Sequence, residues 1–410
     1  MKNMRLIFAL IITYLTFGML LNTVGTVILR SMASLDVSKG AAGWFDGCKD
    51  ISIAIISFAT ASYLPRIGLK RAMLAGLALA GAACALMPLL PSYATICVHY
   101  MLIGMAFALV KVGVYAMIGL VTEDKAAHAS LTSIIEGGFM IGVLGVTLLF
   151  SRFVGNTLND SSQSWLNAYW ILAGLCALAF MVLLIAPVDE TPLRSDVSGH
   201  AALFDMVRLA KLPLVLVFIY CTFTYVFIEQ GIGTWLPTFN NEVLHLPQAM
   251  SVVAGSLYAG ALAAGRIIGG AVIRKSGWFP VLLTCLVIVG AVILLIGPLS
   301  HTDRSHTVMD WAHAPLAAYL FLGIGFFMAP IYPTIVSVIL SANPKSRHTA
   351  LMGLVVVFSA LGGTTDSRLT AELFRRIDGA TAFTLMVVPV GLLLAGLILL
   401  RGQSRNYISK

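Results

Sequence analysis

The chain has 410 residues, of which 59% are hydrophobic and only 11% are charged. Soluble globular proteins carry about 25% charged residues, so this composition excludes an ordinary water-soluble domain and predicts a protein dissolved in a lipid bilayer. The formal net charge of +8 does not indicate a nucleic-acid partner, because the basic residues gather beside the apolar segments rather than on a polar domain.

Apolar stretches follow one another along the whole chain. A transmembrane helix needs about 20 mostly apolar residues. The stretches that satisfy this requirement are 6–30, 41–64, 72–91, 93–122, 129–154, 165–187, 212–239, 248–273, 279–299, 314–341, 349–374 and 380–401. The first is longer than the apolar core of a signal peptide, so we expect it to be retained. The sequence therefore predicts an all-α membrane protein with twelve transmembrane helices.

One polar stretch is longer than any other between the predicted spans. It covers residues 188–211 and contains acidic, basic and hydroxyl side chains. We interpret it as a cytoplasmic linker between an N-terminal six-helix bundle, residues 1–187, and a C-terminal six-helix bundle, residues 212–410.

An internal repeat relates the two predicted bundles. The run GMAFALVKVG begins at Gly104 and leads to a polar turn that ends at His128. The run GFFMAPIYPT begins at Gly325 and leads to a polar turn that ends at His348. Repeats of this kind build transporters whose two pseudo-symmetric halves enclose a substrate site near the bilayer midplane.

The basic residues predict the orientation of the chain. Most of the 26 Lys and Arg lie at the two termini, in the linker and in alternate loops on the same predicted side. Because cytoplasmic loops carry the excess of Lys and Arg, we expect both termini to be cytoplasmic. We expect a multi-pass protein of a bacterial inner membrane.

Ionisable side chains interrupt the predicted spans. They are Asp46, Lys49, Asp50, Lys111, Glu136, Glu229, Arg266, Asp366, Arg368 and Glu372. A charge at the bilayer centre costs at least about 2.5–3.5 kcal/mol and persists only beside an internal partner or a water-filled cavity. Their recurrence on several helices predicts an aqueous path through the membrane, which is typical of a transporter.

Motifs of soluble catalytic sites are missing from the sequence. It contains no Walker loop, no dinucleotide fingerprint and no cluster with metal-ligand spacing. His99, a histidine well placed inside a span, is more typical of a packed residue than of a catalytic one. We therefore expect neither an enzyme nor an ATP-driven pump, and no metal or other cofactor.

Three runs in the second half carry a resemblance to a known family. They are YVFIEQGIGTWL (225–236), AGRIIG (264–269) and IYPTIVS (331–337). With twelve spans in two halves, they resemble spans seven, eight and ten of the fucose permease-like sugar–proton symporters within the major facilitator superfamily. The resemblance implies the major facilitator fold, alternating access, and import of a sugar or related hydroxylated solute with a proton.

The first half departs from that branch. Asn22 stands where the branch has an acid in span one, and Lys111 stands near its span-four glutamate. Ser133 and Glu136 stand at its span-five amide pair. An amide can bind a hydroxyl group but cannot carry a proton, so another residue must couple transport to the proton gradient.

We assign roles to the polar residues on this basis. The expected substrate-binding residues are Asn22, Lys111, Glu229, Gln230, Trp235, Tyr332 and Thr334. The expected proton-coupling residues are Glu136 and Glu229. The expected gating residues are Asp46, Lys49, Asp50, Arg266, Asp366 and Arg368. An indole face suits a sugar ring, a carboxylate beside a desolvated lysine can carry a proton, and charges spaced i, i+3 and i+4 share one helix face.

Structural interpretations of the same first-half residues stay open. Lys111 and Glu136 could form an ion pair that joins spans four and five. The charges of span two could form a water-exposed gate, a salt-bridged latch or a deeper site.

Similar alternatives apply to the second half. Glu229 and Trp235 could simply face lipid headgroups, and Arg266 could bond backbone carbonyls or an acid of the partner half. Arg368 and Glu372 are spaced to pair, and with Asp366 they could also be solvated. Pro330 and Pro333 should bend span ten.

The sequence thus predicts a secondary transporter that moves a small polar organic solute, such as a sugar, a sugar acid or a carboxylated relative. We expect proton coupling, with sodium as the alternative ion, and a monomer surrounded by lipid. The competing function is a proton-driven exporter of amphipathic drugs or of metabolites such as siderophores. A receptor that does not transport is the third class, although the sequence shows no signalling domain.

Overall fold

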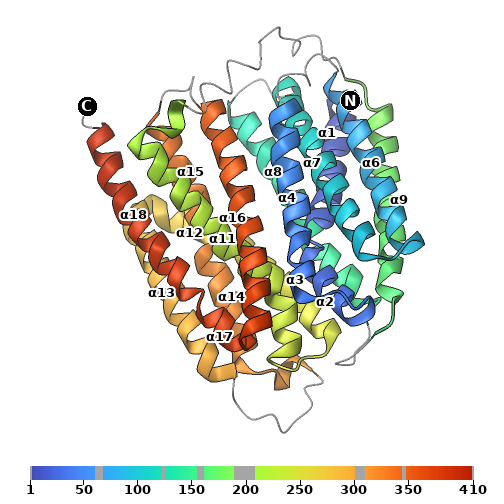
Figure 1. Cartoon of the computed structure of the whole chain (residues 1–410). Coiled ribbons are helices and arrows are strands. Elements are labelled where there is room, and N and C mark those ends of the chain that lie inside the picture. The colour runs from blue at the N-terminus through green and yellow to red at the C-terminus, as the bar shows by residue number, and fades with distance from the viewer. Residues whose placement is uncertain are drawn as a thin grey trace. The chain divides into compact units, whose positions relative to one another are not determined.

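The computed structural model describes residues 2–60, 68–121, 125–154, 161–188, 208–300, 310–343 and 348–408. Within these ranges the regular elements are all helices (Figure 1). The chain forms two compact units. The first consists of Met1–Val37, Trp44–Gly155 and Asp160–Gly199, and the second of Ser38–Gly43, Asn156–Asn159 and His200–Lys410. Most of the predicted linker lies outside the described residues.

The helices of the first unit follow the predicted spans. They are α1 (Lys2–Leu21), α2 (Val24–Ser34), α4 (Trp44–Thr60), α6 (Leu69–Leu89), α7 (Tyr93–Val121), α8 (Lys125–Ser151), η1 (Ser164–Asn167) and α9 (Ala168–Ile185).

The second unit contains the remaining helices. They are α3 (Lys39–Ala42), α11 (Pro213–Glu242), α12 (Gln248–Ser276), α13 (Trp278–Ser300), η3 (Trp311–His313), α14 (Leu316–Met328), α15 (Ile331–Ser341), α16 (His348–Arg376), α17 (Gly379–Thr384) and α18 (Val387–Ile408). Every predicted span is therefore occupied, over its described residues, by one helix or by two in succession.

Ten helices of the described chain are long and apolar enough to cross a membrane by length and composition alone. The two predicted spans that this criterion misses are α4 and α16. Seventeen residues of α4 are described, and α16 carries several charged side chains in its second half. Both pack on membrane-length neighbours, α4 on α7 and α16 on α11.

The first span is not one continuous helix, as we had predicted, but breaks after Leu21. The Asn22 side chain donates through Nδ2 to the Gly18 carbonyl oxygen at 2.9 Å, and the Thr23 hydroxyl donates to the Leu20 carbonyl at 2.9 Å. Short polar side chains of this kind compete with the backbone for the carbonyls of a helical turn. Asn22 thus lies at a helix end, and its side chain is exposed.

The two units use the same scheme of helix packing. In the first, α1 packs on α8 and α9, and α7 packs on α4 and α6. In the second, α11 packs on α16 and α18, and α14 packs on α12 and α13. Counted along the predicted spans, these are the same pairs, and this equivalence agrees with the internal repeat.

The two glycines that begin the repeat occupy corresponding positions. A side chain at Gly104 of α7 would overlap the Lys49 carbonyl oxygen of α4. A side chain at Gly325 of α14 would lie 3.0 Å from the Tyr258 carbonyl oxygen of α12. Each unit therefore brings two helix backbones together at the same point, which only a residue without a side chain permits.

Candidate functional site

Glu136 lies at a junction of three helices in the first unit. Its Oε1 accepts a hydrogen bond from the Tyr115 hydroxyl of α7 and a longer one, 3.5 Å, from the Tyr14 hydroxyl of α1. The two hydroxyls are 3.4 Å apart. Glu136 is half-buried and Tyr14 is buried. A carboxylate on α8 is thus held by donors from both neighbouring helices, in a setting where such bonds are strong.

Aromatic rings surround this carboxylate. The Tyr14 ring lies 5.3 Å from the Phe139 ring and 6.2 Å from the Phe107 ring, measured between centroids. Phe107 in turn packs on Phe17 at 5.7 Å. These rings make the surroundings of the tyrosine–carboxylate contact largely apolar.

Lys111 lies one helical turn before Tyr115 on α7. Its Nζ is 5.6 Å from the centroid of the Phe107 ring, within the range of a cation–π contact. Within the described residues, Lys111 forms no ion pair. Glu136 instead accepts hydrogen bonds from the hydroxyls of Tyr14 and Tyr115. The predicted Lys111–Glu136 ion pair is therefore absent from this structure. A half-buried amine in this position can receive an anionic group of a solute.

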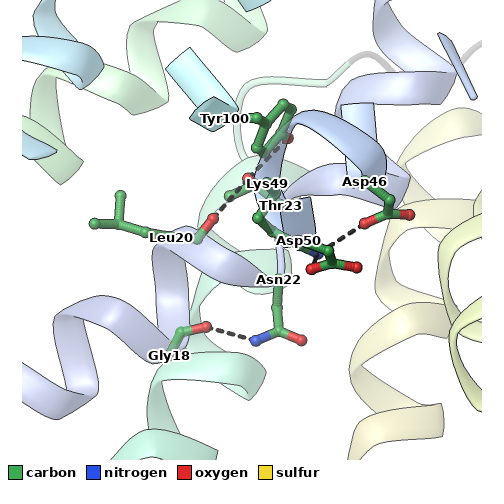
Figure 2. Close-up of polar contacts among 8 residues, drawn as sticks. All are labelled: Gly18, Leu20, Asn22, Thr23, Asp46, Lys49, Asp50 and Tyr100. Atoms are coloured by element: carbon green, nitrogen blue, oxygen red, sulfur yellow. Dashed lines mark hydrogen bonds and ion pairs between the residues drawn. The ribbon is translucent and has the colours of Figure 1, made fainter. Parts of the chain in front are cut away.

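Asp46, Lys49 and Asp50 lie on one face of α4, as their spacing predicts (Figure 2). Lys49 Nζ is 2.7 Å from Asp46 Oδ1 and 3.6 Å from Asp50 Oδ1. The three residues are 0%, 7% and 5% exposed in chain order. They form a buried charge triad rather than the water-exposed gate that was one of our expectations.

The helix break after α1 lies beside this triad. The helix α2 that follows the break contacts α4, and Figure 2 draws the polar contacts of both. The Thr23 hydroxyl is 3.0 Å from the Tyr100 hydroxyl of α7, and both residues are buried. The break thus joins Thr23 to α7, the helix on which α4 packs.

His99, the neighbour of Tyr100, is packed as predicted. Its Nδ1 is 3.0 Å from the Ala83 carbonyl oxygen, and its ring contacts the Tyr169 ring at 5.0 Å. It is fully buried and takes no part in the candidate site.

Glu229 and Arg266 pair in the second unit. The distance from Arg266 Nη2 to Glu229 Oε1 is 3.4 Å, and the side chains are 37% and 19% exposed, respectively. We had expected Arg266 to bond backbone carbonyls or an acid of the other half, but its acidic partner lies on α11 of the same unit. Next to them, the Tyr225 and Tyr332 rings pack with centroids 5.5 Å apart.

A proline kink positions Arg266 and Thr334. Pro330 lies between α14 and α15 and has no N–H to donate to the Phe326 carbonyl, so the helix is interrupted there, whereas Pro333 lies within α15. Gly265 of α12 lies directly against that carbonyl, and Gly269 lies against the Pro330 ring. The glycines of the 264–269 run therefore let α12 approach the kink.

A cavity of about 540 Å³ opens between α12 and α15 beside the kink. Its lining includes Arg266, Gly270, Pro333, Thr334 and Ser337. This volume is within the range of small-molecule sites. The structure thus brings the predicted residues Arg266 and Thr334 to one cavity of the second unit.

Trp235 does not offer the open platform that we predicted. It is 0% exposed, and its ring packs on the Phe374 ring of α16 at 5.4 Å. In this conformation the indole is part of the helix packing, and that expectation is wrong. Its Nε1 and the Gln230 Oε1 are buried without a hydrogen-bond partner among the described residues.

The three charged residues predicted on α16 separate in the structure. Asp366 is 0% exposed, accepts a hydrogen bond from the Thr370 hydroxyl at 3.1 Å and lies against Gly231 of α11, so it is not solvated. Arg368 donates to the Gly40 carbonyl oxygen of α3. Arg368 does not pair with Glu372, so the prediction of that ion pair is wrong.

Glu372 instead bonds to the two arginines that end α16. The Nη2 of Arg375 and the Nε of Arg376 each lie 2.5 Å from Glu372 Oε1. These are exposed pairs at a helix end. Exposed ion pairs of this kind stabilise the end of a helix only slightly.

Sequence reasoning missed Tyr14 as a member of the site. A tyrosine inside an apolar span is equally compatible with lipid, packing or ligand contact, so no local pattern marks it. Only the packing of α1 on α7 and α8 shows that its hydroxyl meets Glu136.

Comparison with known proteins agrees with this architecture. The family model of the Major Facilitator Superfamily matches residues 6–365. The chain is 22% identical over 392 residues to an uncharacterized MFS-type transporter, YceJ, of Bacillus subtilis (strain 168), and the match covers 90% of each protein.

Solved structures of transporters share the fold. A D-xylose-proton symporter aligns with a TM-score of 0.76 and 14% identity over 97% of each chain. A peptide transporter POT in complex with sulfate aligns with a TM-score of 0.78 and 13% identity, covering 98% of this chain and 94% of that one. The chain therefore belongs to the Major Facilitator Superfamily. It is a multi-pass membrane transporter with the two-bundle fold of that superfamily, and not an enzyme.

Proposed function

We propose that this transporter is a proton-coupled symporter that carries a small polar organic solute, hydroxylated or carboxylated, into a bacterial cell across the inner membrane. Glu136 is the proton-coupling residue of the proposal. The observation that carries it is the position of Glu136, a half-buried carboxylate bonded to tyrosine hydroxyls of two other helices.

The chemistry of this junction suits a proton carrier. When Glu136 is ionised, the tyrosine hydroxyls donate to it and draw α1 and α7 toward α8. When Glu136 is protonated, its neutral carboxyl group accepts these hydrogen bonds more weakly. The Tyr14 and Tyr115 hydroxyls can then bond to other acceptors, including hydroxyl groups of a solute. Proton binding is thereby linked to the contacts that join three helices.

Residues of both units support the solute class. In the first unit, Lys111 can pair with a carboxylate, and Tyr115 on the same helix face can bond a hydroxyl group. In the second unit, Arg266, Thr334 and Ser337 give one cavity a cation and two hydroxyl groups. The likeness of the 225–236, 264–269 and 331–337 runs to sugar–proton symporters agrees with a polyhydroxylated substrate.

The test uses purified protein in sealed vesicles with an imposed inward proton gradient. Sugars, sugar acids and carboxylate siderophores are compared as labelled solutes. The wild type should accumulate its solute, and Glu136→Gln should lose accumulation while it keeps solute exchange at equal pH, because exchange needs no net proton movement. Tyr93→Phe, on the same helix as Tyr115 but far along it, is the control and should transport normally.

Two results would overturn the proposal. Unchanged gradient-driven accumulation by Glu136→Gln would remove Glu136 from proton coupling. Expulsion of solute in response to the inward proton gradient would replace symport by export, which is the competing function.

A further inference from the structure

Two thiols meet at the seam between α4 and α7 in the first unit. The side chains of Cys48 on α4 and Cys97 on α7 lie within hydrogen-bonding reach of one another. Both are free cysteines, and both are partly exposed. The fold thus brings together a pair of thiols that are far apart in the sequence.

The packing of the two helices explains this contact. Cys97 lies between Tyr93 and Tyr100, the two residues of α7 whose rings pack on Phe45 of α4. The ring centroids are 5.8 and 5.9 Å from that of Phe45, respectively. Cys48 follows Phe45 at i+3, so it lies on the same face of α4. Both cysteines therefore belong to one stretch of the α4–α7 seam.

The backbones of the two helices approach closely at this seam. A side chain at Gly104 of α7 would overlap the Lys49 carbonyl oxygen and would lie 3.1 Å from the Ser52 Cβ atom. A disulfide requires two short side chains on neighbouring backbones that face each other. The close packing of α4 on α7 meets this requirement for Cys48 and Cys97.

The thiol pair lies near the beginning of both helices. Trp44 begins α4 and Tyr93 begins α7, each one turn before the cysteine of its helix. These two aromatic residues are 43% and 39% exposed. Exposed Trp and Tyr at the ends of spans are typical of the membrane–water interface. Because a helix rises about 1.5 Å per residue, the cysteines lie about 6 Å from the helix ends, where polar reagents can reach them.

The predicted orientation places these helix ends in an oxidising compartment. With cytoplasmic termini, α4 and α7 would begin on the outer side of the inner membrane. Disulfides form and persist on that side, whereas thiols of the cytoplasm are kept reduced.

From this placement we infer that Cys48 and Cys97 form an oxidisable thiol pair, a modification site at which a disulfide joins α4 to α7. The oxidant is a small-molecule disulfide. The thiolate of one cysteine attacks it, forms a mixed disulfide and releases one small thiol. The thiolate of the other cysteine then attacks the mixed disulfide and releases the second small thiol. The protein loses two electrons and two protons, and the small disulfide takes them up as it becomes two thiols.

This inference goes beyond the proposed symport and does not depend on it. Formation of the disulfide is measured on purified protein, in which neither transport nor orientation in a membrane takes part. Failure of the inference is therefore distinguishable from failure of the proposed function.

The test exposes the purified full chain in detergent to oxidised glutathione. The protein is then denatured, its remaining thiols are alkylated, and its peptides are mapped by mass spectrometry. The wild type should yield a linked peptide pair that contains Cys48 and Cys97, and dithiothreitol should abolish it. Cys48→Ser and Cys97→Ser should instead each keep one glutathione on the remaining cysteine, because no second thiol is present to displace it.

A second thiol pair of the same unit is a matched control. The side chains of Cys84 on α6 and Cys176 on α9 also lie within hydrogen-bonding reach of each other, but they are 0% and 1% exposed. In the same oxidised sample they should be recovered as alkylated thiols, because the oxidant does not reach them. This control needs no further variant.

Oxidation should also stabilise the protein, because a disulfide restricts the unfolded chain. The thermal unfolding midpoint of the wild type should rise by several degrees after oxidation and return with dithiothreitol, whereas that of Cys97→Ser should not rise. Recovery of Cys48 and Cys97 as unlinked, alkylated thiols after oxidation would overturn the inference. Equally rapid linking of Cys84 to Cys176 would also overturn it, because exposure at the helix ends would then not select the pair.

Discussion

At the scale of single residues, Lys111 constrains the solute more than any other side chain of the first unit. It is a half-buried amine on a membrane helix, and its contact within the described residues is the face of Phe107, 5.6 Å away. An aromatic face compensates an ammonium group only in part. A solute that brings a carboxylate to Lys111 would complete the pairing, whereas a neutral sugar would not.

Replacement of Lys111 by Gln should therefore change the affinity for charged solutes more than the affinity for neutral ones. We expect the apparent affinity for a carboxylated solute to fall at least about tenfold, because an ionic hydrogen bond contributes about 1.5–3 kcal/mol. The affinity for a neutral polyol should change little. Equilibrium binding to the purified protein measures both values. Equal losses for charged and neutral solutes would show that Lys111 acts on the fold and not on the substrate.

Much of the candidate site follows from residue identity, but its pairings do not. The rule that charges are rare in membrane helices singled out Lys111, Glu136, Glu229 and Arg266, and all four are part-buried in the structure. Sequence spacing could not show that Glu136 bonds to Tyr14, which lies 122 positions away. It also misplaced Trp235, because a buried indole and a ligand platform have the same local pattern.

At the scale of helices, small residues decide which backbones meet. Between membrane helices there is little hydrophobic gain, so close packing depends on van der Waals contact at residues such as glycine. Gly104 lets α7 lie against the carbonyl of Lys49 and so supports the helix that carries the charge triad. Gly137 of α8, by contrast, has open space where a side chain would lie.

This contrast predicts opposite effects of substitution. Gly104→Val should lower the thermal unfolding midpoint in detergent by several degrees, because overpacking costs about 1–3 kcal/mol. Gly137→Ala should leave the midpoint unchanged or raise it slightly, because alanine favours a helix by roughly 1 kcal/mol over glycine. If both variants had equal midpoints, the α4–α7 contact would not be close packed.

The length and order of the helices were predictable, but the break at Asn22 was not. Apolar stretches predicted every span, because lipid requires each backbone group to be bonded within its own helix. The break at Asn22 was missed because residues 6–30 are apolar on average. That average hides Asn22 and Thr23, whose side chains bond to carbonyls of the preceding turn. The interruption at Pro330 was easier to predict, because proline lacks a backbone N–H in any surroundings.

At the scale of the whole molecule, the repeat explains why one chain makes two similar units. The same helix pairs pack in each, with Gly104 and Gly325 at equivalent contacts. The two units differ in their charges. The first contains Asp46, Lys49 and Asp50 together with Lys111, and the second contains the Glu229–Arg266 pair. A common frame therefore carries different polar groups in its two halves.

The direction of proposed transport depends on the orientation of the chain in the membrane. Lys and Arg are retained on the cytoplasmic side during insertion, so Lys275, which is exposed in the last turn of α12, should face the cytoplasm. Asp310, exposed beyond the end of α13, should face the opposite side.

Single cysteines at these positions, in a chain without its six native cysteines, report each side with a membrane-impermeant maleimide. In intact inner-membrane preparations with the outer face exposed, Asp310→Cys should be labelled at once. Lys275→Cys should be labelled only after the membrane is opened. The reverse pattern would invert the chain, and inward symport would then have to be reconsidered as export.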